Sequence, residues 1–474
     1  MTSTRLTRRT LATALGGAGA ASLLAACTQG NPAPDESPSA ASGPRLVLAH
    51  YMPCFPTSLD NAATSVDYYT TQYLRGTGEG RRYAAQGGYL RDRPLPVPVG
   101  GDDWRAANAA REIEVAKKFD IDGFTVDLLA LSGQWWDNSL ALWAAAEATT
   151  GFVLVPMVDM DSLGDATAQQ VADSITPLLK SRVAGRVDGR VAYAAFRPEG
   201  RPTSFWEELT RLLEKAIGSS VAMQAICLDT SKGVIRRFAR TASHIASWGP
   251  RTPEAVPDEA RVRSEVLAAG ARYIGTVAMQ DYRPVRRIYA EARNTSTLRS
   301  SWEAAIANKA SWVHVATWND YAENTCVAPS VAHGEAFLRI IGGYARRYKG
   351  VPASDEEFIV LTARTQLAQA VPRLGSSRGT ATLGGAGSPV DRIEVYTQTS
   401  APVTLKVTTG NKLTTLTHEA GARTTTLPLT AGAVKVQALR SGRAVTGVLS
   451  TPVVQTKPLI GDYSYHAASA LIEA

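Results

Sequence analysis

Short apolar, β-rich runs alternate with amphipathic helical patterns from residue 45 to about residue 350. This alternation is typical of parallel βα units, in which each strand is followed by a helix that covers the sheet. Eight repeats favour a closed (β/α)8 barrel, and a doubly wound open sheet is the alternative. The expected strands are Leu46–Met52, Gly123–Leu128, Phe152–Asp159, Arg190–Phe196, Ala222–Asp229, His244–Trp248, Ile274–Met279 and Trp312–Asn319.

Amphipathic patterns between these runs predict the helices. In the first of them, Ala109, Ile113 and Ala116 form an apolar stripe, and charged side chains occupy the opposite side. A helix with one apolar face packs that face against a sheet. The spacing predicts helices over Asp103–Phe119, Ala166–Ser181, Ser204–Ile217 and Ser330–Tyr348.

The pattern changes after Gly350, where Thr-rich segments with glycine-containing turns replace the helical periods. A period of two residues is typical of half-buried strands. We therefore expect an α/β barrel domain over residues 45–350 and an all-β, sandwich-like domain over residues 351–474. The expected strands of the second domain include Ile393–Gln398, Val403–Thr408, Thr424–Leu429 and Val434–Leu439.

The first 44 residues resemble an export signal and a linker. Residues 7–11, Thr-Arg-Arg-Thr-Leu, resemble a twin-arginine motif, and the uncharged run after them is too short to span a bilayer comfortably. Residues 24–27, Leu-Ala-Ala-Cys, resemble a lipobox, although a plain signal peptide with an incidental cysteine is the alternative. We expect a signal over residues 1–27 with lipidation of Cys27, and a disordered Pro- and Ser-rich linker over residues 28–44. The expected location is the extracellular face of a bacterial cell membrane.

Charge and motif content exclude several classes of function. The formal net charge of +7 over 474 residues falls to +4 without residues 1–26, which hold three arginines and no acidic residue. So small a charge argues against nucleic acid as a partner. No phosphate-binding glycine motif follows a strand, and the histidines lie singly, so we expect neither a cofactor nor a metal. We expect a monomer.

Polar and aromatic side chains close almost every expected strand of the barrel. In such a barrel the chemistry lies at the carboxyl ends of the strands. Aspartates there are also ordinary helix caps, an alternative that stays open for Asp161, Glu199 and Asp229. A functional role is favoured for Asp127, Asp159 and Asp320, because each continues one face of its strand. The other polar and aromatic residues at or just after the ends of the expected strands are His50, Tyr51, Trp248, Asp281, Tyr282, Trp318, Asn319 and Glu323.

Paired carboxylates with aromatic side chains are what glycoside hydrolysis requires. One carboxylic acid protonates the leaving oxygen, while a second carboxylate acts as base or nucleophile. The long connection from Pro53 to Gly101 is rich in tyrosine and could supply one wall of a cleft, or its tyrosines could simply pack the loop onto the barrel. These tyrosines are Tyr68, Tyr69, Tyr73, Tyr83 and Tyr89.

Four segments carry a resemblance to a known family. They are Leu48–Met52, Ile121–Asp127, the Asp159-Met160 pair and, most specific, Trp318–Glu323 with the sequence Trp-Asn-Asp-Tyr-Ala-Glu, together with Pro329. With these motifs the chain resembles glycoside hydrolase family 71, the α-1,3-glucanases or mutanases, over about residues 45 to 350. The trailing β domain also resembles that family's arrangement.

The resemblance implies a (β/α)8 barrel that hydrolyses α-1,3-linked glucan with inversion. It also implies that Asp320 and Glu323 are the catalytic pair, which requires the backbone to turn near Tyr321 so that both can reach one site. We expect the substrate to be bound by His50, Tyr51, Asp127, Asp159, Trp248, Asp281, Tyr282, Trp318 and Asn319.

The sequence departs from the family pattern close to that pair, at Ala322, Asn324, Thr325 and Asp127. The glycosidic linkage therefore stays open. An endo-α-mannosidase-like hydrolase is one alternative, because family 99 enzymes also carry a Trp-Asn-acid sequence after a late strand. A lipid-anchored carbohydrate-binding protein without catalysis is another, although retention of both carboxylates argues against it.

Cys54 and Cys326 are candidates for a disulfide. Each lies just past the carboxyl end of a strand, and the first and eighth strands of a closed barrel are neighbours. Two unpaired thiols are the alternative. Cys227, inside an apolar run, is expected to be a buried free thiol.

Overall fold

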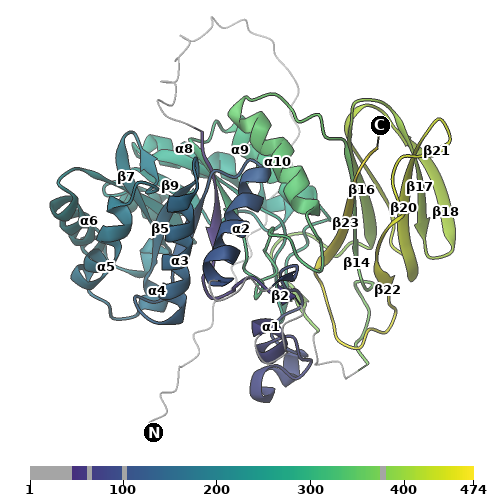
Figure 1. Ribbon diagram of the computed structural model, residues 1–474, viewed down its shortest axis with the longest axis horizontal. Coiled ribbons are helices and arrows are strands. Elements are labelled where there is room, and N and C mark those ends of the chain that lie inside the picture. The colour runs from purple at the N-terminus through teal and green to yellow at the C-terminus, as the bar shows by residue number, and fades with distance from the viewer. Residues whose placement is uncertain (1–44, 61–66, 99–103, 374–379, 474) are drawn as a thin grey trace, which may run out of the picture. The chain divides into compact units, whose positions relative to one another are not determined.

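The computed structural model describes residues 45–60, 67–98, 104–373 and 380–473 (Figure 1). The predicted signal, the lipidation site Cys27 and the predicted linker lie outside the described residues. None of the helices in the described part of the chain is long and apolar enough to cross a membrane.

Eight parallel strands form a closed barrel, which confirms the predicted fold. Neighbouring strands follow the order β5-β4-β1-β13-β10-β9-β8-β7, and a further pairing of β5 with β7 closes the ring. The strands are β1 (Val47–Tyr51), β4 (Gly123–Leu128), β5 (Val153–Asp159), β7 (Arg190–Phe196), β8 (Val221–Cys227), β9 (His244–Ser247), β10 (Arg272–Ala278) and β13 (Trp312–Ala316).

Helices connect these strands and cover the outside of the barrel (Figure 1). The last predicted helix begins later than expected, because residues 321–334 form turns and isolated bridges. The connecting helices are α2 (Trp104–Lys118), α3 (Gln134–Ala148), α4 (Met160–Leu163), α5 (Ala168–Lys180), α6 (Thr203–Ile217), α7 (Lys232–Phe238), α8 (Asp258–Ala268), α9 (Ser296–Ala307) and α10 (Ala336–Lys349).

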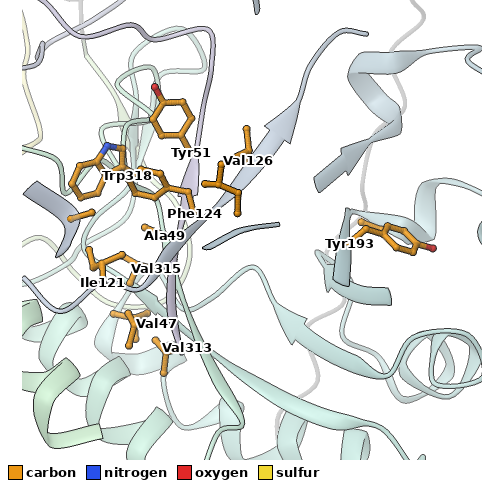
Figure 2. Packing of buried hydrophobic residues seen from close by; sticks show 14 of the residues in the cluster. Val47, Ala49, Tyr51, Ile121, Phe124, Val126, Tyr193, Val313, Val315 and Trp318 are labelled. Carbon is orange, nitrogen blue, oxygen red and sulfur yellow. The ribbon is translucent and has the colours of Figure 1, made fainter. Parts of the chain in front are cut away.

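Strand alternation sorts side chains between the two sides of the barrel wall. Val47, Ala49 and Tyr51 of β1 belong to the large apolar cluster formed with the helices (Figure 2). Leu48 belongs to a separate cluster, with apolar side chains of β5, β7, β8 and β10. Because successive side chains of a strand point to opposite faces, the second cluster fills the barrel interior. His50 has the same parity as Leu48 and therefore also points inward.

Two antiparallel sheets follow the barrel, as expected for a sandwich-like domain (Figure 1). Strand β14 is buried on both faces: Ile359 and Leu361 belong to the core between the sheets, while Phe358 and Val360 belong to the large cluster that also contains residues of α10. The first sheet contains β19 (Gly421–Pro428), β16 (Arg392–Thr399), β14 (Phe358–Arg364) and β23 (Tyr465–Leu471), and the second contains β18 (Lys412–His418), β17 (Val403–Thr409), β20 (Gly432–Arg440), β21 (Arg443–Ala444) and β22 (Leu449–Val454).

A buried ion pair joins the barrel to the β domain. Arg364 at the end of β14 donates from Nη2 to Glu291 Oε2 over 2.8 Å, and both side chains are almost completely buried. The other oxygen of Glu291 accepts from the Tyr465 hydroxyl over 2.6 Å and from the backbone of Arg293 over 3.0 Å. Removal of one partner would leave an uncompensated charge in the interior.

We expect Glu291→Ala to lower the free energy of unfolding by about 3–5 kcal/mol, because it leaves the Arg364 guanidinium buried without its partner. Denaturant unfolding followed by circular dichroism measures this loss. The double substitution Glu291→Met/Arg364→Met should recover much of it. As a control, Glu208→Ala breaks the exposed pair with Arg211 and should leave the transition midpoint nearly unchanged. Equal losses of unfolding free energy in Glu291→Ala and Glu208→Ala would contradict the structural importance of the buried pair.

Candidate active site

A chain of contacts links charged and aromatic side chains at the carboxyl ends of the barrel strands. Asp127 Oδ2 of β4 lies 3.4 Å from His50 Nε2 of β1, and the His50 ring meets Trp248 edge-on at 4.9 Å. The Arg251 guanidinium lies over Trp248 at 5.5 Å and 3.4 Å from Asp281. Arg283, described below, connects Asp281 to Glu323.

The turn after β13 brings Asp320 and Glu323 to this network. The strand ends at Ala316, three residues earlier than expected, and residues 321–324 form a turn. Asp320 Oδ1 accepts from the backbone N–H of Ala322 over 3.0 Å and of Glu323 over 3.2 Å. The Glu323 carbonyl accepts from the N–H of Tyr282, which fixes the turn against the residues after β10. The turn expected near Tyr321 is therefore present.

Arg283 holds two of the acidic groups in place. It donates from Nε and Nη2 to both oxygens of Asp281, over 2.8 and 2.7 Å, and its Nη1 lies 2.8 Å from Glu323 Oε1. A bidentate guanidinium–carboxylate pair fixes orientation as well as charge. Asp281 therefore neutralises part of the positive charge with which Arg283 acts on Glu323.

Burial raises the pKa values of both carboxyl groups of the turn. Burial raises the pKa of Asp320 to about 6, while the bonds from its own turn and the charge of Arg283 oppose the shift. Burial and the charge of Asp320 raise the pKa of Glu323 to about 8, more than Arg283 lowers it. The Glu323 side chain keeps 24% of its surface exposed, so it is reachable from solvent. Near neutral pH the environment thus favours an ionised Asp320 and a protonated Glu323.

Asp127 and His50 form a neutral pair deeper in the barrel. Burial raises the pKa of Asp127 to about 8 and lowers the pKa of His50 to about 3. Asp127 Oδ1 and His50 Nδ1 have no hydrogen-bond partner in the described part of the chain. The pair therefore retains free polar atoms.

Asp159, predicted to bind substrate, caps a helix. Its Oδ1 accepts from the backbone N–H of Asp161 over 2.9 Å, and its Oδ2 accepts from the Ser162 hydroxyl over 2.6 Å. An aspartate at a helix N-cap satisfies N–H groups that the helix leaves free. Both oxygens are used within its own turn, so local structure accounts for this residue.

Tyr51 and Trp318, also predicted to bind substrate, lie on the outer side of the barrel wall (Figure 2). The Tyr51 hydroxyl donates to Glu112 Oε2 over 2.7 Å, and the Trp318 indole N–H donates to Glu112 Oε1 over 3.2 Å. Trp318 is fully buried. Burial raises the pKa of Glu112 to about 7. These side chains anchor β1 and the turn to helix α2 and do not reach the carboxyl-end network.

Asn319 and Tyr282 of the predicted substrate-binding set are also committed to structural bonds. Asn319 Oδ1 accepts from the Met52 N–H over 2.7 Å, and its Nδ2 donates to the carbonyls of Met52 and Phe55. The buried Tyr282 hydroxyl donates to the Gly461 carbonyl over 3.1 Å. Asn319 therefore joins the turn to the chain after β1, and Tyr282 joins the barrel to the β domain.

The remaining acidic candidates have local roles. Glu199 Oε1 accepts from the N–H groups of Leu228 and Asp229, Asp229 Oδ1 accepts from the Ser231 N–H, and Asp161 pairs with Arg197. These contacts match the helix-cap and turn alternative that was left open for them.

Sequence reasoning missed Arg251 and Arg283, since it found few basic partners for the acidic groups. Arg251 lies in the connection after β9, which ends at Ser247, and Arg283 lies in the connection after β10, which ends at Ala278, so both are close to the strand ends that carry the acids. A search for cations as well as acids at the strand ends would have found them. Glu112, in the middle of α2, gives no such positional signal.

The predicted disulfide between Cys54 and Cys326 is not present, since both residues are free thiols in the structure. They pack in one apolar cluster with Phe55 and Tyr69, but Cys326 Sγ faces Asp92 and His333. The two residues therefore share one cluster without a bond between their sulfurs. Cys227 is a buried free thiol, as predicted.

The tyrosines of the long connection pack largely on one another. Tyr69 is fully buried against Tyr321, and the rings of Tyr73 and Tyr83 each lie 4.7 Å from Tyr89. Of the two roles considered for these tyrosines, this arrangement favours packing of the loop onto the turn after β13.

The chain resembles known proteins in its sequence and in its fold. The sequence profile described as Glycosyl hydrolase family 71 matches residues 99–470, which include most of the barrel and the β domain. A solved structure of the GH99 endo-alpha-mannosidase from Bacteroides thetaiotaomicron, in complex with BIS-TRIS-Propane, is similar with a TM-score of 0.51 and 11% identity, over 64% of this chain and 97% of that chain.

A second structure of the GH99 endo-alpha-mannosidase from that organism gives a TM-score of 0.47 and 11% identity, over 57% of this chain and 86% of that chain. At 11% identity, the likeness with the TM-score of 0.51 shows a common fold alone. No curated protein matches the chain.

Proposed function

The chain belongs to glycosyl hydrolase family 71 and is a glycoside hydrolase, and from this premise we propose that it cleaves an α-1,3-linked glucan with inversion. The observation that carries the proposal is the pair Asp320 and Glu323 on one turn, held in environments that separate their pKa values. Glycoside hydrolysis needs one protonated and one ionised carboxyl group at the same time.

In this mechanism Glu323 is the general acid and Asp320 is the general base. Glu323 carries the proton near neutral pH and passes it to the glycosidic oxygen as the bond breaks. Asp320, ionised and held by two backbone N–H groups, takes a proton from the attacking water. Attack from the side opposite the leaving oxygen inverts the anomeric carbon.

Arg251 and Trp248 are the groups best suited to recognise the sugar. Arg251 Nη2 has no hydrogen-bond partner among the described residues, while Nε lies 3.4 Å from Asp281 Oδ2 and the guanidinium lies over the Trp248 ring. Sugar hydroxyl groups are acceptors for such donors. Trp248 is partly exposed and offers a ring for stacking. Asp127, protonated at neutral pH, offers a further donor.

We also propose that the enzyme acts at the extracellular face of the cell membrane, held there by a lipid on Cys27. The lipobox-like sequence before Cys27 and the Pro- and Ser-rich residues after it support this location. A Pro- and Ser-rich tether between the lipid and the barrel would let the enzyme reach insoluble polysaccharide.

The first test of this function is product analysis on purified polysaccharides. We expect release of oligosaccharides from α-1,3-glucan, with the new reducing end formed first as the β-anomer, observed by proton NMR before mutarotation. An initial α-anomer would contradict inversion. Cleavage of an α-mannan but not of α-1,3-glucan would favour the mannosidase alternative, and binding without any product would favour the non-catalytic one.

The second test is the pH dependence of kcat/KM. Activity needs ionised Asp320, so it should fall as pH decreases through about 6, and it needs protonated Glu323, so it should fall as pH increases through about 8. Asp320→Asn and Glu323→Gln should each lower kcat by about 10² or more. The matched control Asp229→Asn should retain activity, because asparagine can still accept from the Ser231 N–H. Near wild-type turnover in both catalytic variants would refute the assignment.

The third test concerns the anchor. Cys27→Ser removes the thiol that would receive the lipid, so the variant should be released from the membrane or left unprocessed. Membrane fractionation with immunoblotting measures the change, and Cys227→Ala serves as the cysteine control. Unchanged membrane retention of the Cys27→Ser variant would reject lipid anchoring at this residue.

A further inference from the structure

Three buried side chains with metal-ligating atoms meet near the catalytic turn, which is the turn after β13 that carries Asp320 and Glu323. They are Asp92, from the connection after β1, and Cys326 and His333, from the segment between β13 and α10. Cys326 Sγ lies 3.8 Å from His333 Nε2 and 4.0 Å from Asp92 Oδ2, and the last two atoms are 3.8 Å apart. The proposed hydrolysis uses none of these groups.

In His333 and Asp92, backbone groups fix the polar atom that does not face the cluster. His333 Nδ1 lies 3.1 Å from the Gly334 carbonyl, so it carries the hydrogen and leaves a lone pair on Nε2. Asp92 Oδ1 accepts from the N–H groups of Arg93 and Ala332, which leaves Oδ2 facing the other two. Carbonyl and backbone partners of this kind orient metal ligands.

The geometry differs from that of a nucleophilic triad. In a triad the nucleophile and the carboxylate bind different nitrogens of the histidine ring. Here the sulfur and the carboxylate oxygen both face His333 Nε2. The three atoms therefore surround a common point.

A fourth polar atom lies near the cluster. The Tyr321 hydroxyl is fully buried and has no hydrogen-bond partner in the described ranges. The phenol is close enough for Cys326 and Asp92 to act on it electrostatically. A buried hydroxyl without a partner is costly unless something occupies the space beside it.

We propose that Asp92, Cys326 and His333 bind a zinc ion, with the Tyr321 hydroxyl serving the fourth position directly or through one water. Zinc takes sulfur, nitrogen and oxygen ligands in tetrahedral sites. Bonds of about 2.0–2.3 Å place neighbouring ligand atoms about 3.3–3.6 Å apart, so only a small contraction of the cluster is required. On binding, a Zn–S bond replaces the S–H bond of Cys326, and the proton leaves to solvent.

Such an ion would link two loops that are far apart in sequence. The same loops already share backbone bonds, from Leu95 N–H to the Pro329 carbonyl over 2.9 Å and from Val331 N–H to the Arg93 carbonyl over 3.0 Å. The segment that carries Cys326 follows Asp320 and Glu323 directly. Zinc would therefore stabilise the catalytic turn through the segment that follows it, and it would not contact the substrate.

The test is zinc uptake by the full chain, prepared without a polyhistidine tag, stripped with a chelator and then equilibrated with zinc. We expect about one zinc ion per chain by mass spectrometry of the metal and a rise in Tm of at least about 2 °C. Cobalt in place of zinc should give a thiolate charge-transfer band. Cys326→Ala should lose the ion, the shift and the band, while Cys227→Ala, which also removes one buried thiol, should keep all three.

Asp92→Asn provides a second variant, because asparagine keeps the oxygen that binds Arg93 and Ala332 and removes only the charge. It should fold. Loss of an outer-shell partner lowers metal affinity by roughly 10–100-fold, and we expect Asp92→Asn to lower the zinc affinity by more than that. Failure of the wild-type chain to retain zinc would overturn the proposal. So would equal zinc binding by the wild type and Cys326→Ala. Metal content is measured without substrate, so these outcomes do not depend on the glucanase assignment.

Discussion

Closure of the eight parallel strands into one ring is the constraint on which the rest of the structure depends. Parallel pairing places all eight carboxyl ends on the same side, and the pairing of β1 with β13 makes the first and last strands neighbours. The chain after β1 and the turn after β13 therefore meet, and Asn319 fixes them together through Met52 and Phe55. Residues almost 270 positions apart in the sequence are thus held within one small region.

Backbone periodicity made the fold and the location of the site predictable. All eight strands were expected close to their observed positions, because buried parallel strands are short apolar runs between helical patterns. Asp127 was placed correctly on the inward face, since alternation along β4 is regular. The same reasoning separates His50 from Tyr51, which are adjacent and therefore point to opposite sides of the barrel wall.

The sequence was least informative where the chain leaves regular structure. Trp318 lies two residues beyond the end of β13, so strand alternation no longer determines its direction, and Glu112 on a distant helix binds its indole. Asp159 shows a different limit, because an aspartate that caps a helix and one that binds a ligand have the same sequence signature after a strand. The free thiols of Cys54 and Cys326 show that two cysteines on neighbouring loops need not form a disulfide.

The bonds that fix Asp320 have a stereochemical consequence. One carboxylate oxygen, Oδ1, is held by two N–H groups of its own turn, and Oδ2 receives no hydrogen bond from any described residue. In the proposed mechanism the group would act as a base with a single available oxygen, whose lone pairs have a fixed direction relative to the backbone. A water molecule could then be activated along few approach angles, so in this mechanism the folded turn would determine the direction of attack on the sugar before any substrate arrives.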